Sequence, residues 1–245
     1  MPTVTTSAFE LILSESSETL RLSTDALLLS AYVRDQKKDE ALEIGAGNGA
    51  VSLLLAKRGV FKKIYALEIQ DELCPILEQN VKANGFDGII APVNADIRSV
   101  NPETFKGVAA VISNPPYMKH SEGKASPLVQ KQIARHEVHG GVYDFCKAAS
   151  KILKTGGRLY LVYRPDRLDT LMRSLAENGF STKRMTYVHA STEHSPSSVL
   201  IEATLGGGEA LMVTKPLILS RDGQDTEDCA FIYKNGRFPD AFFLK

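Results

Sequence analysis

Short apolar runs alternate with amphipathic stretches between residues 40 and 163, and this alternation constrains the fold more than any other feature of the sequence. The apolar runs are short enough to predict buried strands, at residues 41–44, 63–69, 90–97, 109–113 and 158–163. The amphipathic stretches predict helices, at residues 50–59, 71–85 and 144–157. Strands that alternate with helices favour a mostly parallel, doubly wound sheet with helices on both faces, so the predicted fold class is α/β.

After residue 180 the sequence is strand-like on both sides of a Ser/Pro-rich connection. Residues 182–190 and 198–206 predict an antiparallel pair that closes one edge of the sheet, and a turn is expected at Asp222-Gly223. No repeat, low-complexity tract or interdomain linker interrupts the sequence. We therefore predict a single domain, with an N-terminal extension over residues 1–39, a core over 40–206 and C-terminal strands over 207–245.

Two aspartates are predicted to cap helices, because a carboxylate can accept a hydrogen bond from an unpaired amide of the first turn. Asp71 opens the predicted helix 71–85, and Gly85 is its predicted end. Asp25, in the sequence LSTDALLL, is predicted to cap a helix that precedes the first strand.

The charge balance argues against a protein that coats nucleic acid with a general positive surface. The 245 residues include 29 Lys and Arg and 29 Asp and Glu, so nucleic acid would have to bind at a local patch. Cys74, Cys146 and Cys229 are odd in number and far apart, which fits neither a disulfide framework nor a zinc site. The N-terminus lacks a signal-peptide pattern, and no apolar run approaches the ~20 residues of a membrane span. We therefore expect a cytoplasmic protein that uses neither a membrane nor a metal.

The junction after the first predicted strand, LEIGAGNG at residues 42–49, predicts a ligand site. In doubly wound sheets, ligands bind where strands end and helices begin. Gly45, Gly47 and Gly49 allow a sharp turn and a close approach of the backbone to a ligand. Their spacing is G-x-G-x-G rather than the dinucleotide pattern G-x-G-x-x-G. The preceding Glu43 suits a cationic ligand such as S-adenosylmethionine (AdoMet) better than a pyrophosphate.

Acidic residues also follow the second and third predicted strands. Glu68 is expected to accept hydrogen bonds from both ribose hydroxyls of AdoMet, with Ile69 beside it in the cofactor site. Asp96 is expected to accept a hydrogen bond from the adenine amine, with Ile97 packing on the ring. A glycine-rich turn alone is common, and Glu68 alone could be a surface residue. Three acids at three successive strand ends nevertheless favour an AdoMet site over a nicotinamide site.

The sequence SNPPY follows the fourth predicted strand and therefore lies at the same edge of the sheet. The Asn114 side-chain oxygen and the Pro115 carbonyl are expected to accept hydrogen bonds from a planar amino group, such as adenine N6. These acceptors would localise the lone pair of the amine towards a methyl donor, and Asn114 is expected to contact the cofactor as well. Pro115 and Pro116 fix the backbone, and Tyr117 offers a face on which a base stacks. The alternative is a structural Asn-Pro turn beside a core tyrosine.

The segments ALEIGAGNG, YALEI, NADI and ISNPPY occur in the order and spacing of class I AdoMet-dependent methyltransferases that modify amino groups, and the chain resembles that family. The segments LRLSTDALLLSAYV, IARHEVHGG and FPDAFFLK are further similar to the bacterial tRNA1(Val) adenine-37 N6-methyltransferases. Glu43 and Asn48 depart mildly from these enzymes, which more often show Asp and Thr. The resemblance implies a Rossmann-like methyltransferase fold, AdoMet as cofactor, Thr24 and Asp25 near the cofactor, and methylation of adenine N6 in a tRNA.

Other substrates share this chemistry. A DNA adenine-N6 methyltransferase would usually carry a target-recognition domain, and a protein-glutamine N5 methyltransferase of release factors carries a helical domain ahead of the catalytic one. A non-catalytic AdoMet-binding partner of another methyltransferase is the alternative from a different class, and such a protein would have no use for Asn114, Pro115 and Tyr117. The oligomeric state is not predicted.

A polar loop at residues 117–136 carries more basic than acidic residues and follows the SNPPY sequence. Cationic side chains beside a target-base pocket would contact the phosphates of a folded RNA. The equally weighted alternative is an exposed loop that only aids solubility. Arg164, Arg167 and the pair Lys183-Arg184 are expected to extend this basic patch. The predicted substrate-binding residues of the loop are Lys119, Lys124, Lys131, Arg135 and His136.

Overall fold

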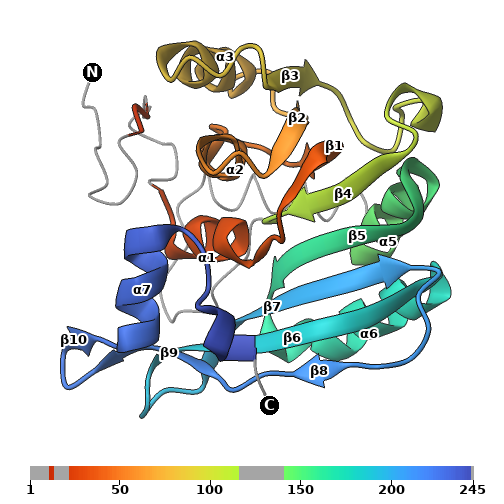
Figure 1. Ribbon diagram of the computed structural model, residues 1–245. Coiled ribbons are helices and arrows are strands. Elements are labelled where there is room, and N and C mark those ends of the chain that lie inside the picture. Colours follow the sequence, from red (N-terminus) through yellow and green to blue (C-terminus); the bar gives the residue numbers. More distant parts are fainter. Residues whose placement is uncertain (1–10, 14–21, 116–140, 244–245) are drawn as a thin grey trace, which may run out of the picture.

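The computed structural model describes residues 11–13, 22–115 and 141–243, which fold around one sheet with helices on both faces (Figure 1). The helices of this part are α1 (Thr24–Tyr32), α2 (Ala50–Lys57), α3 (Cys74–Ala83), α5 (Val142–Ile152), α6 (Leu168–Glu177) and α7 (Glu227–Asn235). The strands are β1 (Gln36–Ile44), β2 (Phe61–Glu68), β3 (Ile90–Asn94), β4 (Val108–Ser113), β5 (Leu153–Tyr163), β6 (Phe180–Ser191), β7 (Pro196–Leu205), β8 (Met212–Val213), β9 (Leu217–Arg221) and β10 (Gln224–Asp225). Among the described residues, these strands pair in the order β10-β9-β6-β7-β5-β4-β1-β2-β3, and β8 pairs with β6.

Parallel pairing of the first five strands brings their carboxyl ends to one edge of the sheet. β1 lies between β2 and β4, and parallel pairing continues to β3 on one side and to β5 on the other. The strand order therefore reverses between β1 and β4. Open α/β sheets bind ligands in the crevice at such a reversal. The predicted doubly wound, mostly parallel α/β fold is confirmed.

The antiparallel pair lies inside the sheet rather than at its edge. β7 pairs antiparallel with β5 on one side and with β6 on the other, which confirms the predicted pair. The predicted edge position is wrong, because β8 and β9 both pair in parallel with the outer side of β6. The predicted turn joins β9 to β10, with φ of 52° at Asp222 and 77° at Gly223.

Each face of the sheet has its own cluster of buried side chains. The first cluster packs beneath α1, α2 and α7 and includes Leu54, Ile64 and Ile232. The second packs beneath α5 and α6 and includes Val111 and Leu171. Because helices cover both faces, β4 is buried along its whole length, which explains why its sequence, VAAVIS, is a continuous apolar run.

Both predicted aspartate caps are wrong. Ser23 caps α1, since its Oγ accepts a hydrogen bond from the Ala26 amide at 3.1 Å. Asp71 lies in a turn before α3, whose N-cap position is Leu73. In each case the N-cap position is occupied by a residue other than the predicted aspartate.

The C-terminal region contains a helix in addition to the predicted strands. Thr226 caps α7, because its Oγ1 accepts a hydrogen bond from the Cys229 amide at 3.2 Å, and Gly236 ends the helix with a φ of 63°. This helix covers the same face of the sheet as α1 (Figure 1). In the part of the chain that the structure describes, no helix is both long and apolar enough to cross a bilayer.

Candidate cofactor and catalytic site

The glycine-rich loop between β1 and α2 makes a tight turn at the switch point. Gly45, Gly47 and Gly49 have φ values of 74°, 58° and 87°, in the left-handed region that favours glycine. A Cβ on Gly49 would lie 2.6 Å from Cδ1 of Leu77, so this glycine lets α3 pack against the loop. A Cβ on Gly45 or Gly47 would meet nothing within 4 Å. The first two glycines therefore leave an open side of the loop that a ligand can approach.

Glu68 fastens the glycine-rich loop to the end of β2. Its Oε2 accepts a hydrogen bond from the Gly47 amide at 2.7 Å, and its Oε1 accepts one from the Gln70 amide at 2.8 Å. The residue is buried at the carboxyl edge of the sheet, where the predicted ribose site lies. A carboxylate has about four acceptor positions, so these bonds do not exhaust its capacity for ribose hydroxyls.

Glu43 is buried in β1, is not among the residues that line the cleft, and anchors α2. Its Oε2 accepts a hydrogen bond from the Ser52 amide at 3.0 Å and another from the Ser52 hydroxyl. Burial raises the pKa of Glu43 to about 8, because desolvation outweighs the opposing effect of these hydrogen bonds. The predicted contact between this acid and a cationic ligand stays a prediction.

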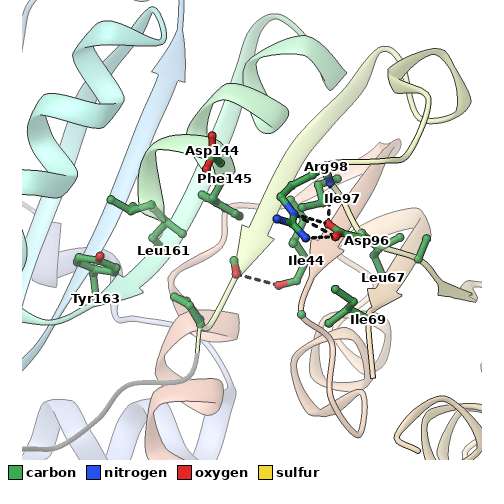
Figure 2. A pocket seen from close by; sticks show the side chains of 15 residues that line it. Ile44, Leu67, Ile69, Asp96, Ile97, Arg98, Asp144, Phe145, Leu161 and Tyr163 are labelled. Carbon is green, nitrogen blue, oxygen red and sulfur yellow. Dashed lines mark hydrogen bonds and ion pairs between the residues drawn. The ribbon is translucent and has the colours of Figure 1, made fainter. Parts of the chain in front are cut away.

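Asp96 holds the turn after β3 together with Arg98. Asp96 Oδ1 accepts hydrogen bonds from the Arg98 amide at 2.9 Å and from the Arg98 Nε at 3.0 Å, and the guanidinium also pairs with Oδ2. The predicted partner of Asp96 is an adenine amine, and that contact stays a prediction. Figure 2 shows the ion pair at one side of a cleft, with Ile97 beside it.

The cleft at the carboxyl edge has a volume of about 120 Å³ and is mostly apolar. It extends to both sides of the end of β4, with Leu67, Ile69 and Ile97 on one side and Phe145 and Tyr163 on the other (Figure 2). An apolar cleft with a few polar groups is typical of a site for a small molecule or cofactor. Its lining residues are Ile44, Gly45, Leu67, Ile69, Ala95, Asp96, Ile97, Arg98, Ser113, Pro115, Val142, Asp144, Phe145, Leu161 and Tyr163.

The end of β4 brings the predicted catalytic sequence to this cleft. The Ser113 hydroxyl donates a hydrogen bond to the Ile44 carbonyl at 2.8 Å, which fastens the end of β4 to the end of β1. Asn114 follows directly, and Pro115 lines the cleft. The remaining predicted catalytic residues, Pro116 and Tyr117, lie outside the described residues. The predicted substrate-binding residues Lys119, Lys124, Lys131, Arg135 and His136 also lie outside them.

Thr24 and Asp25 begin α1 and are not among the residues that line the cleft. Asp25 Oδ1 accepts a hydrogen bond from the Ser198 hydroxyl at 3.1 Å, so this carboxylate connects α1 to β7. Thr24 is exposed. Their role near a cofactor stays a prediction.

Arg184 does not extend a surface patch, so this part of the predicted basic surface is wrong. The side chain is buried, with its Nη2 2.9 Å from Glu202 Oε2 and its guanidinium 3.8 Å from the centre of the Tyr32 ring. An arginine in this position ties β6 to β7 and α1 as a structural ion pair. Arg164 pairs with Asp166 just after β5.

The sequence matches the model of a known protein family. The model of the methyltransferase small domain family matches residues 17–183, which includes the glycine-rich loop, Glu68, Asp96 and the SNPPY sequence. The chain belongs to this methyltransferase family. The family match confirms the resemblance that the sequence segments carry.

Named relatives agree with this assignment, and a solved structure is similar in fold. The tRNA1(Val) (adenine(37)-N6)-methyltransferase of Porphyromonas gingivalis is 28% identical over 209 residues, which cover 82% of this chain and 81% of the relative. The enzyme of the same name from Dyadobacter fermentans is 28% identical and covers 69% of this chain and 70% of the relative. A predicted O-methyltransferase from Agrobacterium tumefaciens is similar in fold, with a TM-score of 0.70 at 22% identity, over 88% of this chain and 97% of that one.

Several residues of the cleft were not predicted as part of a site. Val142 and Phe145 lie in the first turn of α5, and the sequence shows Phe145 only as a member of the amphipathic helix predicted at 144–157, which does not include Val142. Leu161 and Tyr163 end β5, where they read as ordinary strand residues. Arg98 has no sequence signal beyond its place two residues after Asp96. The position of β5 and α5 beside β4 could have drawn attention to the first four.

Proposed function

We propose that this protein is an AdoMet-dependent N-methyltransferase that methylates N6 of an adenine in RNA, and that its target is adenine 37 of a valine tRNA. One observation carries the proposal: Asn114 and Pro115 leave β4 next to the glycine-rich loop, and Ser113 fastens the two strand ends together. The sequence proposed to bind the amine and the apolar cleft therefore share one edge of the sheet.

The residues present fit AdoMet. The open side of Gly45 and Gly47 gives room for close contact with the backbone, and the cleft offers apolar faces from Ile69 and Ile97 to an adenine ring. Glu68 lies at the end of β2 with acceptor capacity for hydroxyl groups. When bound, AdoMet would supply an activated methyl group.

The chain's own contribution to the reaction is to hold the target amine. Asn114 is proposed to accept one hydrogen bond from the amine through its side-chain oxygen, and the Pro115 carbonyl to accept the other. Acceptors that are fixed before the substrate binds stabilise the transition state without reorganisation. A proline after each acceptor position restricts the backbone and keeps the Pro115 carbonyl aimed.

The choice of RNA rests on the relatives, because both named enzymes act on adenine 37 of a tRNA. A base in an anticodon loop is only partly stacked, so extruding it costs less than breaking a duplex pair. Adenine in DNA and the glutamine side chain of a release factor also carry planar NH2 groups. The test therefore includes both as competing substrates.

The test is mass spectrometry of the methylated products. The protein is incubated with AdoMet and, separately, with unmodified tRNA, DNA and release factor, and an Asn114→Ala variant serves as the matched control. We expect N6-methyladenosine in tRNA treated with the wild-type protein and almost none with the variant. Methylated glutamine on a release factor, or N6-methyladenine in DNA with none in tRNA, would refute the RNA assignment.

A further inference from the structure

A buried asparagine on α3 holds the glycine-rich loop from the side away from the cleft. Asn80 is completely buried, and its Nδ2 donates a hydrogen bond to the backbone carbonyl of Asn48 at 2.9 Å. Residues 74–83 form α3, and none of them is among the residues that line the cleft. Asn80 therefore reaches the cofactor site through its hydrogen bond to the loop.

The hydrogen bond from Asn80 restrains the loop at a deformable point. Asn48 lies between Gly47 and Gly49, which both have left-handed φ values, so the loop backbone is locally easy to deform. Glu68 holds the loop at the Gly47 amide, and Asn80 holds it one residue later at the Asn48 carbonyl. Two hydrogen bonds from separate elements thus fix the peptide groups on either side of the one that joins Gly47 to Asn48.

Packing supports the same restraint. Leu77, one turn before Asn80 on α3, lies against Gly49, where a Cβ would approach its Cδ1 to 2.6 Å. The glycine and the leucine allow α3 to come close enough for the Asn80 amide to reach the loop. The contacts of α3 with the loop therefore include a packing contact and a hydrogen bond.

Asn84, the C-cap residue of α3, connects the helix to the N-terminal segment rather than to the loop. Asn84 Nδ2 donates to the Ile12 carbonyl at 2.7 Å, and its Oδ1 accepts from the Ile12 amide at 2.9 Å. These bonds dock residues 11–13, whose Leu11 and Leu13 are buried. Asn84 Nδ2 also donates to the backbone carbonyl of Asn80 at 2.7 Å. Asn84 is thus a comparison for Asn80, because it is the same residue type at the end of the same helix but bonds to Ile12 and to the helix backbone.

We propose that Asn80 is a positioning residue of the cofactor site, which sets the glycine-rich loop in its ligand-ready shape before the cofactor binds. The inference rests on the proposed function, in that the ligand of the loop is taken to be AdoMet. Asn80 touches neither the cofactor nor the substrate in this scheme. Its effect passes through the Asn48 carbonyl, whose restraint lowers the cost of ordering the loop on binding.

The test compares three single variants, in α3 and at its C-cap, with the wild-type protein. Asn80→Ala removes the donor to the loop, and Val81→Ala removes a buried side chain of the same helix. Asn84→Ala removes the contact with Ile12 and the hydrogen bond to the Asn80 backbone carbonyl, but leaves the Asn80 side chain in place. We expect Asn80→Ala to weaken the binding of S-adenosylhomocysteine about tenfold in calorimetry, the loss of roughly one hydrogen bond. We expect kcat at saturating AdoMet and KM for tRNA to stay within about twofold of wild type. The two control variants should keep their affinity within about twofold even where their Tm falls equally.

A second substitution of Asn80 distinguishes the loss of the hydrogen-bond donor from the loss of side-chain volume. Asn80→Asp keeps the size of the residue but places an acceptor against the Asn48 carbonyl, so it should weaken binding at least as much as alanine does. If Asn80→Ala lowers Tm and leaves the affinity at the wild-type value, Asn80 is structural only and the inference is overturned.

Hydrogen exchange of the ligand-free protein tests, without any cofactor, whether Asn80 restrains the glycine-rich loop. We expect the peptide that covers residues 45–52 to exchange faster in Asn80→Ala than in Val81→Ala, because only the first variant releases the loop. Equal exchange in the two variants would overturn the inference. Failure of the wild-type protein to bind AdoMet would instead refute the proposed function, while the exchange result would still decide the role of Asn80.

Discussion

Replacing Glu43 by glutamine should stabilise the protein at alkaline pH and have little effect in acid. In the folded protein, burial raises the pKa of this carboxyl from its usual value of 4.5 to about 8. The folded state therefore binds more protons than the unfolded state between these two pH values, and stability falls as pH rises through this range. Glutamine cannot ionise, yet its side-chain oxygen can still accept the hydrogen bonds from Ser52.

The magnitude follows from the same two pKa values. The wild-type protein should lose about 4 kcal/mol relative to Glu43→Gln between about pH 5 and pH 8.5, at about 1.4 kcal/mol for each factor of ten in proton affinity. Most of this loss falls below pH 8, and the difference should level off above it, once Glu43 is ionised in both states. Any constant cost of the new amide group cancels, because only the change with pH is compared.

The assay is urea denaturation of both proteins across this pH range, without ligand. Glu103→Gln is the matched control, because its exposed carboxylate pairs only with the exposed Lys106 at 2.7 Å among the contacts that the structure describes. For this control we expect a difference from wild type that stays nearly constant with pH. A difference between Glu43→Gln and wild type that does not grow between pH 5 and pH 8.5 would refute the reasoning, since the buried carboxyl would then carry no penalty for ionising.

Three further substitutions test the candidate site. Glu68→Ala should weaken AdoMet binding by about tenfold or more in calorimetry, because the Gly47 amide and the proposed ribose hydroxyls lose their acceptor. Unchanged affinity in a folded variant would show that the ribose does not bind at Glu68. Asn114→Ala should lower kcat by roughly a hundredfold while AdoMet binding stays nearly intact, since its acceptor acts mainly in the transition state; wild-type turnover would make the SNPPY sequence structural. Gly49→Ala should lower Tm and weaken AdoMet binding together, because alanine is strained at a φ of 87° and its Cβ would lie 2.6 Å from Cδ1 of Leu77. A normal Tm would show that the loop accommodates alanine without cost.

Local sequence chemistry was enough to predict the edge of the sheet at which the site lies. The short apolar run at residues 109–113 predicts a buried strand, and the structure places it in β4, which is buried on both faces. The glycines of LEIGAGNG predict a turn that needs left-handed backbone, and all three have it. These features depend on a few neighbouring residues, so they can be read without knowing the rest of the fold.

Helix ends were predicted less well because several nearby residues can compete for the same role. Ser23 and Asp25 are both chemically suitable caps for α1, and the structure uses the serine. Asp71 is a good cap by type, but α3 begins only at Cys74, whose next residue, Pro75, suits the first turn. Thr226 is an equally good cap for α7, which the sequence reading took for a strand region.

The sequence by itself determined which chemical groups reach the carboxyl edge of the sheet, because strand order and spacing place Gly45, Glu68, Asp96 and Asn114 there. Only the tertiary structure decided what these groups and their neighbours contact. Glu43 anchors Ser52, Asp96 pairs with Arg98, and a distant helix supplies Asn80 to the loop. Partners of this kind are set by how helices pack on the sheet, and packing brings together residues whose separation in the chain carries no periodic signal.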